Sequence, residues 1–290
     1  MAALALAYPS TARECRVFLL AGQSNMEGVG LAAQAPSNLL NQADVRLYHS
    51  TNVHSSLPAN QWHALVPAGA SPNHFGPELT IGARLAAALP DAPVALIKHA
   101  RGGTKLTVEA LPYKTTGWHP GAEASDTAAF GAEFALFVTT VTNALAAIRA
   151  QGDDPVLSGM FWVQGEADST SAAAGAAYGA NFACFVRRVR EQFGAPELPI
   201  VCAQILPYQT RPGSAAVRQA LADADQDSGK PAAVSRVLMV PTDGLGINPD
   251  QVHFNAQGQL ALGERLADAL LTRGPGLSAP KKTGAAAPPK

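Results

Sequence analysis

The stretch that decides the fold is FLLAGQSNMEGVG, Phe18–Gly30, in which an apolar run ends at Gly22 and a serine follows between two amides. Apolar runs bounded by turn residues are typical of strands buried on both faces of a sheet. The run predicts a strand over Arg16–Ala21 and places Ser24 just beyond its carboxyl end. A serine in that place is either the cap of a short helix or a nucleophile held at the edge of a sheet.

Similar apolar runs recur along the chain and alternate with helical patterns. The expected strands are Arg16–Ala21, Val45–His49, Val94–His99, Ser158–Val163, Ile200–Leu206 and Val237–Pro241. Apolar residues at helical spacing mark Pro77–Leu89, Ala128–Ala150, Ala174–Phe193, Ser214–Gln226 and Asn255–Leu271. Strands that alternate with helices form right-handed crossovers and a parallel sheet covered on both faces. We therefore predict the α/β class, as a three-layer α/β/α sandwich with about five main strands.

One domain accounts for most of the chain. We expect an N-terminal extension over 1–14, the α/β domain over 15–272, and a disordered Pro/Ala/Lys-rich tail over 273–290. Two long polar stretches, Thr51–Asn73 and Leu106–Thr127, interrupt the domain and are rich in Pro, Gly, Trp and His. Structureless insertions of that length are usually functional loops. Their tryptophans, Trp62 and Trp118, are either platforms for stacking on a sugar or packing residues of the loops.

Composition excludes several classes of partner. Charged residues make up 15% of the 290 residues, the net charge is −1, and no basic stripe occurs, which argues against nucleic acid and anionic membranes. The three cysteines form neither a disulfide framework nor a zinc motif, and no HxH or HExxH spacing occurs. We expect no metal and no cofactor. The N-terminus carries no complete signal peptide, so localisation stays open. The sequence does not indicate an oligomeric state.

Chemically useful residues gather where the expected strands end. They are Gln23, Ser24 and Asn25, then Arg101, Gly102, Gly103 and Thr104, then Gln164, Gly165, Glu166 and Asp168, and finally Asp243, Asp250 and His253. Ligands of an open parallel sheet bind outside the carboxyl ends of its strands. Acyl transfer needs a serine, an imidazole that takes its proton, and a carboxylate that fixes the imidazole tautomer. The sheet edge therefore offers a complete set for acyl transfer.

The spacing suggests a role for each group. Asp250 and His253 lie three residues apart, so both side chains can approach one point beside Ser24. An oxyanion needs preorganised donors, which the N–H of Ser24, an N–H of the Gly102-Gly103 turn and the side-chain amide of Gln164 would supply. Glycine suits such a turn because no side chain blocks the approach of a substrate.

The residues in this constellation resemble the SGNH/GDSL hydrolase superfamily. Four motifs occur in family order: AGQSNMEG with the serine, KHARGGT with the glycine, WVQGEAD with the amide, and DQVHF with the aspartate and histidine. Within that superfamily the chain is similar to the sialate O-acetylesterase-like group, which includes the acetylxylan esterases of carbohydrate esterase family six. The resemblance spans Gly22 to His253 and implies a flavodoxin-like sheet and a serine esterase mechanism.

The resemblance implies Ser24 as nucleophile, Gly102 as an oxyanion donor with Gly103 as its alternative, and Gln164 in place of the usual asparagine. Relatives use either the aspartate of DxxH or the glutamate of QGE as the triad acid. Asp250 is our prediction for the triad acid. Glu166 is either the alternative acid or a residue that orients Ser24, Asn25 or His253, and Asn25 is a scaffold amide around the turn. The chain departs from the family at two positions, because Gln23 replaces the usual aspartate and Val163 replaces a histidine.

The sequence therefore predicts a serine carbohydrate O-acetylesterase that acts on acetylated xylan or O-acetyl sialic acid. The alternatives are a lipid or thioester hydrolase on the same fold, or a catalytically inactive sugar-binding module. Lys98 and Arg101 either bind the carboxylate of an acidic sugar or are paired locally. A polysaccharide substrate would favour export, an expectation that comes from the resemblance alone.

Overall fold

The protein is described here from a computed structural model, which covers residues 12–107, 117–123 and 125–277. The strands of its main sheet are β1 (Arg13–Gly22), β3 (Gln42–His49), β5 (His63–Leu65), β8 (Val94–Ala100), β9 (Asp153–Val163), β10 (Ile200–Ala203) and β11 (Val237–Val240). Short strands outside it are β2 (Gly30–Leu31), β4 (His54–Ser55), β6 (Ala68–Gly69) and β7 (His74–Phe75). All six strands expected from the sequence are therefore present, within a few residues of the predicted limits.

Five of the helices that the structure describes follow the prediction, and the short helix α1 is additional. They are α1 (Ser24–Glu27), α2 (Glu78–Ala88), α3 (Ala132–Ala150), α4 (Ala172–Gln192), α5 (Ser214–Ala224) and α6 (Ala256–Arg273). Asn255 caps α6, because its side chain accepts a hydrogen bond from the backbone N–H of Gly258. Within the described residues, no helix is long and apolar enough to cross a membrane.

The sheet order is β11-β10-β9-β1-β8-β3-β5, and every neighbouring pair except β3 and β5 is parallel. A flavodoxin-like sheet has the order 2-1-3-4-5, whereas here the third parallel strand, β8, lies between the first and the second. The first strand is therefore central, with β8 on one side and β9 on the other. The loops that follow these three strands meet at one edge, at the point where the strand order reverses.

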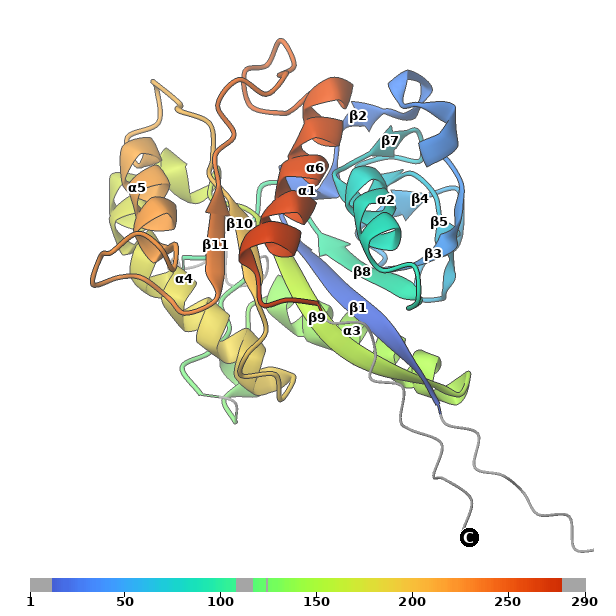
Figure 1. The fold of residues 1–290 in the computed structure, drawn as a ribbon. Helices are drawn as coiled ribbons and strands as arrows, with labels where there is room; N and C mark the ends of the chain where they lie inside the picture. The colour runs from blue at the N-terminus through green and yellow to red at the C-terminus, as the bar shows by residue number, and fades with distance from the viewer. Residues whose placement is uncertain (1–11, 108–116, 124, 278–290) are drawn as a thin grey trace, which may run out of the picture.

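Helices cover both faces of the sheet (Figure 1), so the predicted three-layer sandwich is confirmed. Along β1, Val17 and Leu19 point into the core that contains residues of α3, α4 and α5. Phe18 and Leu20 point into the opposite core, which contains residues of α2 and α6. This alternation follows from the period of two along a strand, and it buries β1 on both faces.

One long polar stretch is not structureless, contrary to the prediction. Thr51–Asn73 contains β4, β5 and β6, and β5 adds an antiparallel seventh strand beside β3. Strands of two or three residues are too short to leave a period-two signal. Trp62 donates from Nε1 to the carbonyl oxygen of Ala144, and Trp118 is fully buried, so both tryptophans are packing residues.

Most of the tail for which we predict disorder, residues 278–290, lies outside the described residues. Most of the predicted N-terminal extension, residues 1–11, also lies outside them. The domain limits of 15 and 272 stay a prediction.

Candidate active site

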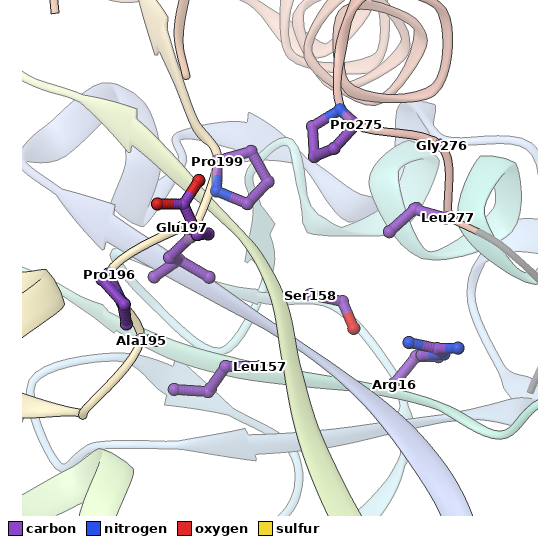
Figure 2. Close-up of a pocket in the computed structure, with 11 residues that line it drawn as sticks. Arg16, Leu157, Ser158, Ala195, Pro196, Glu197, Pro199, Pro275, Gly276 and Leu277 are labelled. Carbon is purple, nitrogen blue, oxygen red and sulfur yellow. The ribbon is translucent and has the colours of Figure 1, made fainter. Parts of the chain in front are cut away.

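Two hollows differ in the chemistry of their walls. One, of about 280 Å³, lies beside the amino end of β10 and is lined by Arg16, Ser158, Glu197 and several apolar residues (Figure 2). It contains no histidine. The other, of about 530 Å³, lies at the carboxyl ends of the central strands and is lined by Gln23, Ser24, Gly102, Gly103, Lys105, Glu166, Ala167, Thr170, Arg211, Val252 and His253. Of these two hollows, the second brings together the predicted nucleophile, Ser24, and the predicted base, His253.

A tight turn after β1 places Ser24 in this hollow. A Cβ atom on Gly22 would lie 2.1 Å from the carbonyl oxygen of Val163, so only glycine allows the two backbones to approach so closely. The chain then enters α1 at Ser24, whose N–H has no intrahelical acceptor because it belongs to the first turn. Glycine at the strand end thus sets the serine and a free backbone donor at the edge of the sheet.

The structure brings Ser24, His253 and Asp250 into one hydrogen-bonded line. Nε2 of His253 lies 2.9 Å from Oγ of Ser24, and Nδ1 lies 2.7 Å from Oδ2 of Asp250. Oδ1 of Asp250 accepts the backbone N–H groups of Val252 and His253 at 2.9 and 3.0 Å. Partial burial raises the pKa of Asp250, but the hydrogen bonds from the His253 side chain and these N–H groups outweigh it, so the net pKa is lowered.

The two candidates for the triad acid occupy different places. Asp250 contacts the imidazole directly, whereas Glu166 makes no hydrogen bond to His253 and instead accepts from Nδ2 of Asn25 at 2.6 Å. Glu166 is 2% exposed, and burial raises its pKa. The geometry therefore favours Asp250 as the group that fixes the imidazole tautomer and leaves Glu166 without a role in the triad.

In the glycine turn after β8, the backbone N–H groups of Gly102 and Gly103 differ in their hydrogen bonding. The N–H of Gly102, the preferred donor of this turn in the sequence analysis, lies 2.8 Å from Oε2 of Glu27 and donates to it. The N–H of Gly103 has no hydrogen-bond partner within the described residues, and Gly103 lines the hollow with φ +73°. The structure therefore differs from the preferred assignment and favours the alternative, Gly103, because a carboxylate already occupies the N–H of Gly102.

Gln164 lies deeper than predicted. Its side chain is fully buried and does not line the hollow. Nε2 donates to Oδ2 of Asp168 at 2.7 Å and to the carbonyl oxygen of Thr104 at 3.0 Å, while Oε1 accepts from the hydroxyl of Tyr178. Both amide protons are thus engaged in supporting the loops after β8 and β9. This arrangement does not supply the side-chain oxyanion donor that the sequence predicted.

Neither of the cations considered for a sugar carboxylate faces the hollow. Lys98 is fully buried, and its Nζ donates to Oε2 of Glu78 at 2.6 Å and to the carbonyl oxygen of Glu27 at 3.0 Å. Burial lowers the pKa of Lys98, although the charge of Glu78 opposes that effect. Arg101 is paired with Glu133. Both therefore act locally, and Lys98 supports the last residue of the helix that begins at Ser24.

Replacing Lys98 is expected to destabilise the domain. In Lys98→Met the carboxylate of Glu78 stays buried without its cation, which should lower the free energy of unfolding by about 3–5 kcal/mol. Urea denaturation measures the change, with the exposed Lys230→Met as the matched control. The double variant Lys98→Met/Glu78→Gln should recover part of the loss, since a neutral amide still accepts the N–H of Gly76. An unchanged midpoint in Lys98→Met would contradict this account.

Three residues of the site were not predicted from the sequence. Glu27 holds the glycine turn, Arg211 donates to the carbonyl oxygen of Glu166 at 2.7 Å, and Tyr208 donates to the carbonyl oxygen of Val252 at 3.1 Å. Glu27 belongs to the quoted serine motif, so its position was a usable signal. Arg211 and Tyr208 lie in a loop without a motif. Among the residues that the structure describes, no group of His, Cys, Asp or Glu is arranged to hold a metal ion.

Comparisons with known proteins give a family and several similar folds. Residues 14–272 match the model of the family described as "Carbohydrate esterase, sialic acid-specific acetylesterase". No curated protein sequence matches the chain. A solved structure of an Arabidopsis thaliana protein is similar with a TM-score of 0.66 at 20% identity, over 89% of this chain and 98% of that one.

Two further solved structures are similar. That of NanS has a TM-score of 0.64 at 16% identity, over 90% of this chain and 98% of that one. That of a carbohydrate acetylesterase from Xanthomonas citri has a TM-score of 0.56 at 20% identity, over 88% of this chain and 55% of that one. At these identities the likeness shows a shared fold.

Proposed function

Since the chain belongs to the carbohydrate esterase family of sialic acid-specific acetylesterases, we propose that it removes O-acetyl groups from sugars through an acyl-enzyme on Ser24. The observation that carries the proposal is the unbroken line from Asp250 through His253 to Ser24, with distances of 2.7 and 2.9 Å. A serine hydroxyl becomes an effective nucleophile only beside such a base.

In the proposed first half-reaction, Oγ of Ser24 attacks the acetyl carbonyl carbon while its proton passes to Nε2 of His253. The N–H groups of Ser24 and Gly103 stabilise the oxyanion. The ester C–O bond then breaks, and the sugar oxygen leaves with the proton from His253. Asp250 accepts from Nδ1 throughout and stabilises the imidazolium.

In the second half-reaction, water attacks the acetyl group on Ser24 and gives a proton to Nε2 of His253. The acyl bond to Oγ breaks, Ser24 regains its proton from His253, and acetate leaves. Each proton transfer in this mechanism passes between Ser24, His253 and the substrate or water, and Asp250 holds His253 from outside the lining.

The charge around the hollow favours an acidic sugar over a neutral one. The cationic side chain of Arg211 lines it, while its one acidic lining residue, Glu166, is buried. The guanidinium of Arg211 is held by its bond to the carbonyl oxygen of Glu166 and lies 4.2 Å from the ring centroid of Tyr208. A preorganised guanidinium suits a carboxylate, so we propose O-acetyl sialic acid as the preferred substrate over acetylated xylan.

Acetate release from the two substrates tests this preference. The wild type should act faster on O-acetyl sialic acid than on acetylated xylan. Arg211→Met should raise KM for O-acetyl sialic acid by about 10–100-fold, the effect of one hydrogen bond to a charged group. The increase should be much smaller for the neutral ester 4-nitrophenyl acetate, which serves as the matched control. A faster reaction with xylan would overturn the proposed substrate.

The alternative functions have distinct signatures. A lipid or thioester hydrolase needs an apolar channel for its acyl chain, whereas Ala167 and Val252 contribute the apolar side chains among the residues that line this hollow, and neither is large. An inactive sugar-binding module would leave Ser24 unreactive. Labelling of Ser24 by an organophosphate without acetate release from either sugar would retain the mechanism and reject the substrate class.

A further inference from the structure

Glu166 is the one acidic side chain of the hollow that the proposed mechanism does not use. We propose that Glu166 is a positioning residue, which acts through Asn25 to hold the loop that carries His253. This inference rests on the proposed function, because it assigns His253 the role of catalytic base. It also decides between the two roles that the sequence left open for Glu166, a triad acid or a residue that orients its neighbours, and it names the contacts through which Glu166 acts.

Asn25 brackets His253 on both sides. Its Oδ1 accepts the backbone N–H of Phe254 at 3.1 Å, and its Nδ2 donates to the carbonyl oxygen of Val252 at 3.1 Å. A backbone donor at one end and a backbone acceptor at the other leave a single orientation for the amide. Its second Nδ2 proton is directed to Oε1 of Glu166 at 2.6 Å. Asn25 is fully buried, so each of these bonds is protected from water.

Glu166 is itself fixed from its own backbone. Its carbonyl oxygen accepts from Nη1 of Arg211 and from Oγ of Ser169, both at 2.7 Å. These two bonds hold the backbone of Glu166 in the loop after β9, and they therefore fix the base of the side chain whose carboxylate contacts Asn25. Through Asn25, the ties continue to the residues on either side of His253. The contacts form one path from Glu166 to the imidazole that faces Ser24.

The surroundings of the second carboxylate oxygen of Glu166 indicate whether the role of this residue needs a negative charge. Oε2 is buried and has no hydrogen-bond partner within the described residues. Burial, the largest cause, raises the pKa of Glu166, although the hydrogen bond from Asn25 and the charges of His253 and Arg211 oppose it. Only Oε1 makes a contact that orients Asn25. A glutamine has the same shape and keeps that acceptor, so a positioning role does not need the negative charge.

Two substitutions at one position provide the test. Glu166→Ala leaves the N–H of Asn25 without an acceptor, and kcat should fall by about 10²-fold, as a displaced catalytic group predicts, with KM little changed. Glu166→Gln should recover most of this loss across the pH profile of kcat with 4-nitrophenyl acetate. If Glu166→Gln loses as much activity as Glu166→Ala, Glu166 acts through its charge and the proposal is overturned.

A double-mutant cycle tests whether the effect passes through Asn25. If it does, Glu166→Ala should cost little in the Asn25→Ala background, because the path is already broken. Independent, additive losses in the two variants would contradict the path. Thermal denaturation of each variant identifies any that does not fold, and Glu166→Gln, which keeps the shape of the side chain, then carries the comparison.

Hydrogen exchange keeps the test separate from the proposed function. Exchange of the Phe254 N–H, which donates to Asn25, should accelerate in Glu166→Ala and return toward wild type in Glu166→Gln. This exchange rate can be measured without turnover. If the wild type lacked esterase activity, the proposed function would be overturned, and the exchange rates would still test the path from Glu166 to the loop of His253. Unchanged exchange in Glu166→Ala would overturn the path.

Discussion

Ser24→Ala is expected to lower kcat by about 10⁶-fold, comparable to the loss of the nucleophile in other serine hydrolases. Among the described residues, the Oγ of Ser24 makes one hydrogen bond, to Nε2 of His253 at 2.9 Å, and Ser24 is 9% exposed. Its removal therefore deletes the nucleophile and leaves the packing around it intact. Acetate release from O-acetyl sialic acid measures the loss, and mass spectrometry after treatment with an organophosphate should show no label.

A second hydroxyl in the same hollow offers a matched control. Thr170 also lines the hollow, but its Oγ1 donates to the carbonyl oxygen of Ala167 and makes no hydrogen bond to a histidine among the described residues. Thr170→Ala should still be labelled at Ser24, because the pair of Ser24 and His253 is intact. Labelling that persists in Ser24→Ala would show that another residue reacts and that the serine after β1 is only the start of a helix.

The parts of this site that follow from local sequence were predictable. Ser24 follows an apolar run and a glycine, and DxxH spacing brings Asp250 and His253 to one point. Each of these features depends on residues within a few positions of one another. Alternating strands and helices then bring the two segments to the same edge of the sheet, since parallel strands end together. The line from Asp250 to Ser24 is thus a consequence of two local patterns and one topology.

The assignment of the oxyanion donors was less predictable, because it depends on distant pairs. Glu27 takes the N–H of Gly102 across 75 positions, and the amide of Gln164 turns toward Thr104 across 60 positions. A sequence motif shows that an amide or a glycine is present, but not which neighbour satisfies its protons. The seventh strand, β5, was missed for a related reason, since its pairing with β3 leaves no periodic signal in three residues.

Asp250→Asn is expected to lower kcat by about 10⁴-fold, as the same change does in another serine hydrolase. The reason lies in the two oxygens of Asp250. Oδ1 accepts the backbone N–H groups of Val252 and His253, and Oδ2 faces Nδ1 of His253. An asparagine must place its oxygen against the two N–H groups, so its NH₂ group faces Nδ1. That donor selects the tautomer with the proton on Nε2, which cannot accept the proton of Ser24.

The expected loss in Asp250→Asn comes from the orientation of the new amide more than from the removal of the negative charge. The side chain of Asp250 is 49% exposed, so solvent screens much of its attraction for the imidazolium, whereas the tautomer is fixed by a hydrogen bond that screening does not remove. Asp243→Asn, which changes an exposed aspartate paired with Arg218, is the matched control and should keep its activity. A small loss in Asp250→Asn, together with a large one in Glu166→Gln, would move the triad acid to Glu166. A large loss of kcat in Asp250→Asn, together with a small one in Glu166→Gln, would identify Asp250 as the triad acid and Glu166 as the positioning residue. A neutral amide could then replace the carboxylate of Glu166 but not that of Asp250.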